Sequence, residues 1–381
     1  MKSTTHPSTQ SLLKISRRSV LNTFGLGSAA ILLLGTSGIS AQEEEKEPQP
    51  IRWGFVGTGS IANQMARATK DSPNAVLTAS SSRTLEKAEA FAAKYEASKA
   101  FDSWAEMCQW DGIDAVYVAT PTSVKEEISI AAAKAGKHVL CEKPLPSLPA
   151  TQRIIAACRE NNVAFMDGTH FSHHPRTLQL QKEIDTLVGK RRTLDSIFQF
   201  RIGDKTNIRM STELEPMGAL GDAGWYNMRA IVDYLDPTAE LQSVSAIIRR
   251  EPETQAVIGS TGLLVFSDGS SSTFSCSFDA GESRNEARIV GNQGSLDIPN
   301  FLGHDRDNSA SYTHSARTNK SGKETVKVEA DRPDAALMFE DFAAQVHDPS
   351  LRKNWETKSE RTQALLDAVW ASALANEDSQ E

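Results

Sequence analysis

A short glycine turn has the residue types and spacing that bind a pyrophosphate. An apolar run at 51–56 leads into it, and a helix-forming run at 60–70 follows. In this G-x-G-x-x-A spacing the first glycine permits a sharp turn, the second lets a phosphate approach the backbone, and the alanine lets the helix pack on the strand. The free N–H groups and positive dipole end of the helix would face the phosphates. The predicted dinucleotide contacts are Gly57, Thr58, Gly59, Ser60, Ile61 and Ala62.

The end of the next strand indicates which dinucleotide this turn would bind. A strand is expected at 75–80, and Ser82 and Arg83 follow it. An NAD site usually has a carboxylate at this place for the ribose 2′-hydroxyl. A hydroxyl and a guanidinium instead suit a 2′-phosphate, so the sequence favours NADP over NAD. The alternative is an ordinary helix start, with Ser82 as its cap and Arg83 in solvent.

Strands and helices alternate along residues 51–168, an order that would position the glycine turn. Apolar runs predict strands at 51–56, 75–80, 114–119, 137–141 and 163–166. Helix-forming runs predict helices at 60–70, 84–95, 104–110, 124–135 and 148–161. The alternation is typical of an α/β fold with a doubly wound parallel sheet of the Rossmann type. Ligands of such sheets bind beyond the carboxyl ends of the strands, where Thr120, Pro121, Glu142 and Lys143 lie.

Three motifs at these distances resemble one family of oxidoreductases. They are the glycine turn, Ala119-Thr120-Pro121 and Glu142-Lys143-Pro144. The combination is similar to the glucose–fructose oxidoreductase, inositol dehydrogenase and related (Gfo/Idh/MocA) family, over nearly the whole chain from about Ile51. The resemblance implies that Lys143 lies beside the nicotinamide and the substrate hydroxyl. It also implies that Thr120, Pro121 and Glu142 lie at the cofactor.

The loop after Pro121 departs from the pattern of this family. Many members have an asparagine next and a histidine three residues later. Here those places hold Thr122 and Lys125.

Residues 169–381 are predicted to form a second, α+β domain that binds the substrate. β-type runs separated by turn signals lie at 193–201, 241–249, 261–266, 271–278 and 286–290. The alternation in 271–278 favours a large, open, half-exposed antiparallel sheet. One face would cover the substrate and the other would form a subunit interface, which predicts a homodimer or homotetramer. Helices are predicted at 176–188, 335–346 and 359–376, and a polar surface loop at 301–326.

The segment 217–233 resembles a substrate-binding element of the same family. That element reads D-x-G-x-[His/Tyr], and the matching positions are Asp222, Gly224 and Tyr226. The resemblance implies that Asp222 and Tyr226 reach the substrate. A tyrosine in this place is similar to the branch that contains glucose–fructose oxidoreductase and the dihydrodiol and xylose dehydrogenases. The alternative is a helix start, with Asp222 as its cap and Tyr226 as a packing residue.

These residues suggest how a hydride and a proton would move together. The hydride would pass between a carbinol carbon of a sugar or polyol and C4 of the nicotinamide, because the cofactor carries that chemistry. We expect Tyr226 to accept the hydroxyl proton and Lys143 to favour its ionisation and stabilise the alkoxide. Asp222 would hold a second hydroxyl and orient the ring. In the reverse direction Tyr226 would protonate the alkoxide.

A histidine-rich segment at 168–176 follows the last predicted strand of the first domain. Three histidines close together could indicate a metal site. No carboxylate or cysteine accompanies them at ligand spacing, and the family resemblance does not call for a metal, so none is predicted. A contact that lines the substrate pocket is instead expected from among His170, His173 and Arg176.

The first 41 residues have the pattern of a targeting segment rather than of a folded element. Ser16-Arg17-Arg18 precedes a moderately apolar run at 20–34, and Ile39-Ser40-Ala41 resembles a cleavage site. This predicts a twin-arginine signal peptide at 1–41, a linker at 42–50, and a periplasmic or otherwise exported protein. The apolar run is too weak for a good membrane span. The alternatives are a Sec signal, an uncleaved anchor, or a cytoplasmic dehydrogenase without a signal.

Composition excludes several classes of partner. The formal net charge is −8, and residues 1–41 carry four cations and no acid, so their removal gives −8 − 4 = −12. Without a basic surplus, neither nucleic acid nor an anionic membrane surface is an expected partner. The spacing of the four cysteines matches no zinc pattern, and buried free thiols are expected.

Export leads to a further hypothesis about the cofactor. The twin-arginine route carries folded protein, and free NADP is not expected outside the cytoplasm. The enzyme would then hold its cofactor tightly and regenerate it by oxidising one substrate and reducing another, in ping-pong fashion. Two other functions stay open at this point: a nicotinamide-dependent glycoside hydrolase of the same family, and an exported sugar-binding protein without turnover.

Overall fold

A computed structural model describes residues 49–316 and 322–379 of the chain. Both sheets presented below lie within one unit, Gln49–Glu381. The predicted signal peptide at 1–41 and most of the predicted linker at 42–50 lie outside the described residues. Among the described helices, none is long and apolar enough to cross a membrane.

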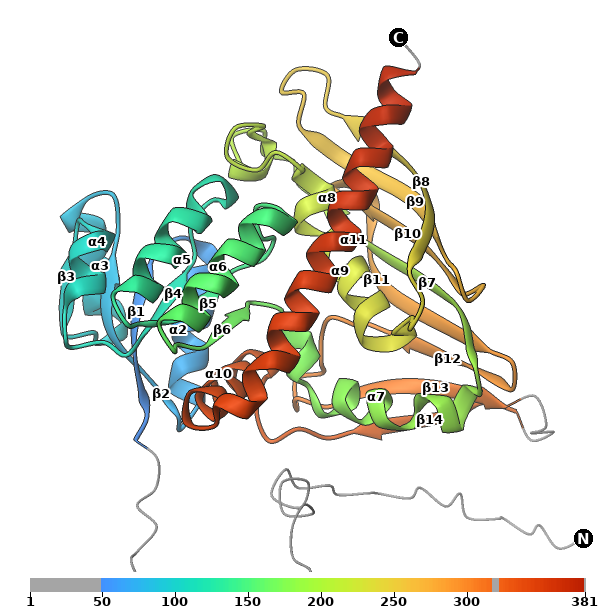
Figure 1. Ribbon diagram of the computed structural model, residues 1–381, viewed down its shortest axis with the longest axis horizontal. Helices are drawn as coiled ribbons and strands as arrows, with labels where there is room; N and C mark the ends of the chain where they lie inside the picture. The colour runs from blue at the N-terminus through green and yellow to red at the C-terminus, as the bar shows by residue number, and fades with distance from the viewer. Residues whose placement is uncertain (1–48, 317–321, 380–381) are drawn as a thin grey trace, which may run out of the picture. The chain divides into compact units, whose positions relative to one another are not determined.

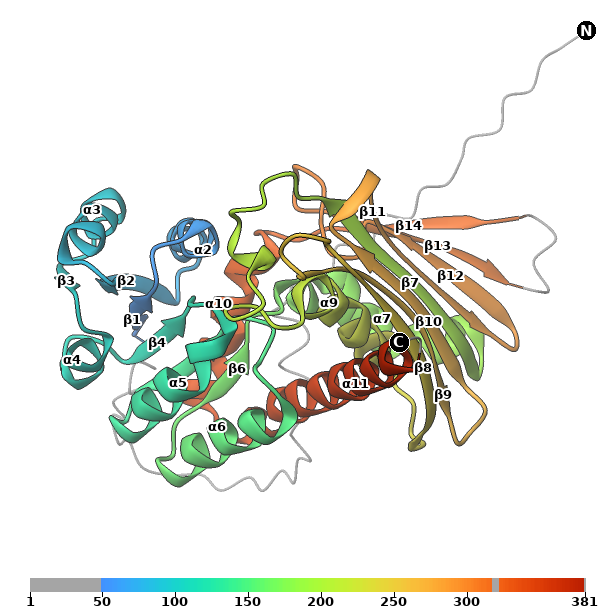
Figure 2. The same cartoon turned by 90° about the horizontal axis from the view of Figure 1, so that it is seen from above.

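The first domain contains the predicted doubly wound parallel sheet (Figures 1 and 2). Its strands are β1 (Ile51–Val56), β2 (Ala75–Ser81), β3 (Lys99–Phe101), β4 (Ala115–Val118), β5 (His138–Cys141) and β6 (Phe165–Asp167). They lie in the order β3-β2-β1-β4-β5-β6, and every pair is parallel. The order reverses between β1 and β4, which is where such sheets bind dinucleotides. Five strands were predicted, but the three-residue edge strand β3 was not.

Alternating side chains give this sheet two apolar faces, and helices cover both. The helices are α2 (Ser60–Asp71), α3 (Leu85–Tyr95), α4 (Trp104–Gln109), α5 (Lys125–Lys134) and α6 (Leu148–Glu160). Trp53, Phe55 and Tyr117 pack with α2 and α3 on one face. Val116 and Val118 pack with α4, α5 and α6 on the other. The five predicted helices are confirmed, with no end shifted by more than one residue.

The second domain contains an eight-stranded sheet in the order β14-β13-β12-β11-β7-β10-β9-β8. Its strands are β7 (Arg191–Arg201), β8 (Leu241–Arg250), β9 (Val257–Phe266), β10 (Ser271–Ser277), β11 (Asp279–Gly291), β12 (Gly294–Pro299), β13 (Ala310–Ala316) and β14 (Glu324–Val328). All neighbouring pairs are antiparallel except β7 and β10, which are parallel. The predicted open antiparallel sheet is therefore present, with one parallel pair at its centre.

The sequence predictions for this domain missed β12 and were wrong for one further segment. The segment 301–326 was expected to be a surface loop, but it contains β13 and the start of β14. The strand signal is weak because only Ala310 and Tyr312 of β13 are buried, while its other residues are small or polar and partly exposed. The strand is stabilised by pairing with β12 and β14, which the local composition does not reveal.

Helices of the second domain cover one face of the large sheet or pack on the first domain. They are α7 (Pro175–Val188), α8 (Gly218–Asp222), α9 (Gly224–Ala230), α10 (Asp334–His347) and α11 (Arg352–Asp378). Figure 2 shows α7, α9 and α11 on the same side of that sheet. Helix α10 instead packs on the first sheet, where Phe339 and Phe342 contact Trp53 with ring centroids 5.0 and 4.9 Å apart. The chain after residue 168 thus completes the core of the first domain.

A buried ion pair joins the last strand of the first sheet to helix α9. Arg229 on α9 donates to the carboxylate of Asp167 at the end of β6, and both side chains are inaccessible to solvent. Ser359 of α11 also donates to Asp167, at 2.5 Å. One turn away on α9, the indole of Trp225 donates to the hydroxyl of Thr169 at 2.7 Å. Burial alone would raise the pKa of Asp167, but Arg229 and the hydroxyl donors hold it below its usual value.

We expect Arg229→Ala to destabilise the protein by about 3–5 kcal/mol, because it leaves the Asp167 carboxylate buried without its cation. Denaturant unfolding of the purified variant measures this. Arg361→Ala is the matched control, since Arg361 pairs with Asp236 at the surface and should lose less than about 1 kcal/mol. Equal losses in the two variants would contradict the structural role of the buried pair.

Candidate active site

The glycine turn has the geometry that a dinucleotide phosphate requires. Gly57 has a φ of +102°, and a Cβ there would lie 2.7 Å from the carbonyl oxygen of Ala119, so only glycine fits. A Cβ on Gly59 would meet nothing within 4 Å, which leaves open space above the backbone. Helix α2 then begins without a side-chain cap or an acidic residue in its first turn. Its unpaired N–H groups fit an anionic group.

The end of β2 lies next to this turn, as the sequence predicted. The Ser82 and Thr58 hydroxyls are 3.2 Å apart, and the Arg83 side chain is exposed. Thr84, not Ser82, caps helix α3 by accepting the Lys87 N–H. The alternative role of Ser82 as a helix cap is therefore excluded.

The ends of β4 and β5 carry the next predicted residues. The Thr120 hydroxyl is buried and has no hydrogen-bond partner within residues 49–316 and 322–379. Such an orphan polar atom fits a site that is completed by a bound group. Further along this loop, the Thr122 N–H and hydroxyl donate to Glu215 at 3.1 and 2.6 Å. The side chain that replaces the common asparagine therefore points to the second domain.

The Glu142 carboxylate is buried and binds Tyr117 and the backbone of Lys143. Its Oε1 accepts the Tyr117 hydroxyl at 2.5 Å, and its Oε2 accepts the Lys143 N–H at 3.1 Å. A Cβ on Gly168 would lie only 2.7 Å from Oε1, so the carboxylate is enclosed. Each oxygen thus accepts one bond from within the protein, and the predicted cofactor contact of Glu142 stays a prediction.

Lys125 supports the same loop from another side. Its ammonium is buried and donates to the carbonyl oxygen of Pro144 at 2.8 Å. Burial lowers the pKa of Lys125, and nearby Cys141 and the carboxylates of Glu215 and Glu142 only partly offset this. Lys125, which replaces the histidine common in the family, thus holds the loop Glu142-Lys143-Pro144 in position.

Lys143 reaches across to the second domain and forms an ion pair with Asp222. Its Nζ is 2.5 Å from Oδ1 of Asp222, at the end of α8. Arg209, in the loop between β7 and α8, binds the same carboxylate through Nε at 2.8 Å. Burial alone would lower the pKa of Lys143 and raise that of Asp222. The mutual attraction outweighs burial, so the pKa of Lys143 lies above its usual range and that of Asp222 well below.

Tyr226 completes the cluster from helix α9. Its ring is 4.8 Å from Nζ of Lys143, and its side chain is 7% exposed. Phe171 and Phe198 hold the ring, with centroids 6.2 and 5.5 Å away. Its hydroxyl makes no hydrogen bond within the described parts of the chain, which leaves it available to a ligand.

Burial and the charges around Tyr226 shift its pKa in opposite directions. Burial raises the pKa of Tyr226 more than Lys143 lowers it, and Glu142 and Asp222 add to the rise, so the pKa is about 12. Lys143 therefore does not ionise this phenol in the free protein. The neutral phenol suits the donor role predicted for carbonyl reduction, and the acceptor role in oxidation stays a prediction.

The three candidates in the histidine-rich segment have different surroundings. His170 is 17% exposed and its ring lies 6.4 Å from that of Tyr226. His173 is buried, stacks on Trp355 and bonds Asp341. Arg176 is buried and donates to the carbonyl oxygens of Asn300 and Phe301. The structure thus places only His170 near the cluster and does not support substrate contacts from the other two.

Two further features of this region were not predicted. Arg209 was missed because a single arginine in the polar loop 202–216 carries no motif, and only the fold brings it to Asp222. Asp334, at the start of α10, bonds His170 from 164 residues away.

Within residues 49–316 and 322–379, no group of three or more histidine, cysteine, aspartate or glutamate side chains could hold a metal ion. All four cysteines are buried and free, as expected.

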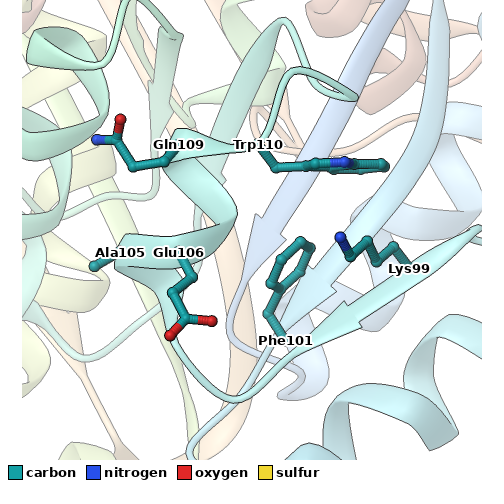
Figure 3. A pocket seen from close by; sticks show the side chains of 6 residues that line it. All are labelled: Lys99, Phe101, Ala105, Glu106, Gln109 and Trp110. Carbon is teal, nitrogen blue, oxygen red and sulfur yellow. The ribbon is translucent and has the colours of Figure 1, made fainter.

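Two of the pockets in the described part of the chain are grooves outside the cluster. One, of about 580 Å³, is lined by Phe198, Phe200, Arg284, Asn285 and Asn300 among others. It adjoins the cluster, since Phe198 also contacts Tyr226. The other, of about 430 Å³, lies between β3 and α4, where Lys99 points toward Phe101 and Trp110 (Figure 3). None of the cluster residues lines this second groove.

Comparisons with known proteins agree with this geometry. The sequence model described as "Oxidoreductase family, NAD-binding Rossmann fold" matches residues 51–169, and that of the GFO/IDH/MocA C-terminal domain matches residues 180–297. A dTDP-3,4-didehydro-2,6-dideoxy-alpha-D-glucose 3-reductase of Actinomadura kijaniata is 32% identical over 60% of this chain and 68% of its own. The NADP⁺-dependent scyllo-inositol 2-dehydrogenase IolU of Bacillus subtilis is 35% identical over 39% of this chain and 46% of its own.

The fold comparison leads to the same family. The structure of KijD10, a 3-ketoreductase from Actinomadura kijaniata in complex with NADP and TDP-benzene, superposes with a TM-score of 0.77 at 27% identity. The match covers 85% of this chain and 98% of KijD10. The chain belongs to the Gfo/Idh/MocA oxidoreductase family, and it is an NAD(P)-dependent oxidoreductase that acts on CH–OH groups.

Proposed function

We propose that this enzyme uses NADP to move a hydride between the nicotinamide and a hydroxyl or carbonyl carbon of a sugar or polyol. The observation that carries the proposal is the cluster of Lys143, Asp222 and Tyr226, in which Nζ lies 2.5 Å from the carboxylate and 4.8 Å from the ring. Relatives that act on a keto sugar nucleotide and on an inositol support this substrate class.

Several residues would bind the dinucleotide so that its nicotinamide ring lies beside this cluster. The turn at Gly57 and Gly59, the start of α2, and the orphan hydroxyl of Thr120 fit its phosphates and polar groups. When bound, the cofactor supplies the hydride chemistry. The chain itself must bind the sugar, place its reacting carbon and move one proton.

Proton transfer is the task of Tyr226 and Lys143. With a pKa of about 12 the Tyr226 phenol keeps its proton at neutral pH, so it can protonate a carbonyl oxygen as that group is reduced. The Lys143 ammonium would stabilise the negative charge that develops on this oxygen. The resting protonation state therefore suits carbonyl reduction, and alcohol oxidation needs the phenol to lose its proton first.

Asp222 and Arg209 give the site its polar contacts for the rest of the sugar. Asp222 is ionised and shared between two cations, so its remaining capacity can accept a bond from a sugar hydroxyl. The groove lined by Phe198, Phe200 and Asn285 provides apolar and amide contacts next to Tyr226. This mixture suits a ring with apolar faces and hydroxyl edges.

Tyr226→Phe should lower the rate of sugar reduction by NADPH about 10²–10⁴-fold, because the ring stays in place and only the proton donor is removed. Steady-state kinetics measure the rate, and NADPH fluorescence titration should show unchanged cofactor binding. Tyr312→Phe is the control, since Tyr312 lies on β13 in the far part of the sheet. A Tyr226→Phe enzyme that keeps the wild-type rate would overturn the assignment.

The end of β2 supports NADP over NAD. Ser82 and Arg83 stand where an NAD enzyme would carry an acid, and the exposed Arg83 guanidinium is able to pair with a 2′-phosphate. Arg83→Ala should weaken NADPH binding about tenfold or more while NADH binding stays unchanged. Arg67→Ala, at an exposed position of α2, serves as control. Equal loss of both coenzymes would show that Arg83 does not read the 2′-phosphate.

The proposal extends to where the enzyme works. The pattern Ser16-Arg17-Arg18 before an apolar run supports export by the twin-arginine route. An exported enzyme would retain its cofactor and oxidise one substrate while reducing another.

Protein purified from the exported fraction, without added cofactor, should release about one nicotinamide nucleotide per chain on acid extraction. Its N-terminus should begin near residue 42. Protein that carries no nucleotide would exclude the two-substrate cycle, and an intact N-terminus on cytoplasmic protein would exclude export.

A further inference from the structure

Three adjacent strands of the parallel sheet each deliver one polar residue to the same edge. Thr120 follows β4, Lys143 follows β5 and His170 follows β6, and these strands are neighbours in the sheet. Because the carboxyl ends of parallel strands meet at one edge, His170 lies on the side where Lys143 acts. The His170 and Tyr226 ring centroids are 6.4 Å apart.

Asp334 fixes one nitrogen of the His170 ring. Its Oδ2 is 3.2 Å from Nδ1 of His170, and its Oδ1 accepts the Ala335 N–H at 2.8 Å. Asp334 is the first residue of α10, so the helix dipole also favours its negative charge. A carboxylate at Nδ1 keeps a proton on that nitrogen. Nε2 makes no hydrogen bond within residues 49–316 and 322–379, so it is the nitrogen available for exchange.

The charged groups around His170 come from several elements. Asp334 lies on α10, Glu142 and Lys143 lie in the loop after β5, and His304 contacts the other oxygen of Asp334 at 3.6 Å. Burial alone would lower the pKa of His170, but Asp334, with help from Glu142, outweighs burial and the Lys143 charge. The pKa of His170 is therefore raised above its usual value, which favours the charged ring.

Tyr226 needs such a neighbour. It is almost fully buried, and each reduction removes its phenolic proton. Lys143 is a poor replacement donor, because Asp222 holds its ammonium in the charged form. Among the groups around the Tyr226 ring, His170 is therefore the one suited to titrate near neutral pH.

We propose that His170, positioned by Asp334, returns the proton that Tyr226 gives to the substrate. In reduction, the phenolic O–H bond breaks as the substrate oxygen takes the proton, while the reduced nicotinamide supplies the hydride. The phenolate then takes the Nε2 proton of His170, directly or through a bridging hydroxyl, and the neutral imidazole recovers a proton from solvent. Oxidation runs these steps backwards. This inference rests on the proposed function.

The first test needs neither cofactor nor turnover. Histidine side-chain NMR titration of the purified protein should show a His170 signal that titrates above the ordinary histidine range. Asp334→Asn should move that midpoint to lower pH, because it removes the carboxylate that favours the charged ring. A His170 signal that titrates at the same pH in both proteins would overturn the pairing.

The second test follows the reduction of fructose, as a simple keto sugar, by NADPH across pH. The rate should fall as pH rises through the His170 midpoint, and Asp334→Asn should move this fall to lower pH. His170→Ala should slow the reaction about tenfold to a hundredfold and lose the fall, and added imidazole should restore part of the rate. His347→Gln, which changes an exposed histidine at the end of α10, should change nothing.

The outcomes separate this inference from the proposed function. If His170→Ala keeps the wild-type rate and pH profile while Tyr226→Phe is inactive, the relay is wrong and the oxidoreductase assignment stands. A slow His170→Ala enzyme that imidazole does not rescue, with an unchanged pH profile, would reduce His170 to a structural role. If the wild-type protein neither oxidises added NADPH with any keto sugar nor oxidises one sugar while reducing another, the proposed function itself fails.

Discussion

The buried ion pair between Asp167 and Arg229 is the interaction on which the active site depends. It fastens helix α9, which carries Tyr226, to the end of the last strand of the first sheet. The Trp225–Thr169 and Ser359–Asp167 bonds surround it. A buried charge without its partner is strongly unfavourable, so this connection tolerates little displacement. The ion pair thereby holds Tyr226 at a set distance from the carboxyl ends of the parallel strands.

A second set of charged residues lies beside Tyr226, and in it two cations bind one carboxylate. Lys143 and Arg209 share the single carboxylate of Asp222, so two cations lie where a substrate oxygen would become negative. Tyr226 sits beside it, yet burial keeps its proton in place. The carboxylate of Asp222 keeps Lys143 and Arg209 charged, so that they can stabilise an oxyanion. Burial favours the neutral phenol of Tyr226, which can donate its proton.

Much of the first domain could be predicted from local sequence. Buried parallel strands are continuous apolar runs, and the glycine turn needs particular residues whatever surrounds it, as the φ of Gly57 shows. Prediction failed for β3, for β12 and for the region of β13 and β14. These strands are short or half-exposed, and their stability comes from neighbouring strands far away in the sequence. For the same reason α10 could be recognised as a helix, but its packing on the first sheet could not.

In the candidate site, too, some features follow from local sequence and others only from the tertiary structure. The sequence by itself determined the residue types at Lys143, Asp222 and Tyr226 and the phosphate-binding turn, because each belongs to a short motif with local geometry. Only the tertiary structure decided that Arg209 shares Asp222, that Asp334 orients His170, and that Arg176 and His173 are structural. It also decided the direction in which the pKa of Tyr226 is shifted, because the pKa of a buried group depends on its exposure to solvent and on charges from several distant segments, which no local pattern encodes.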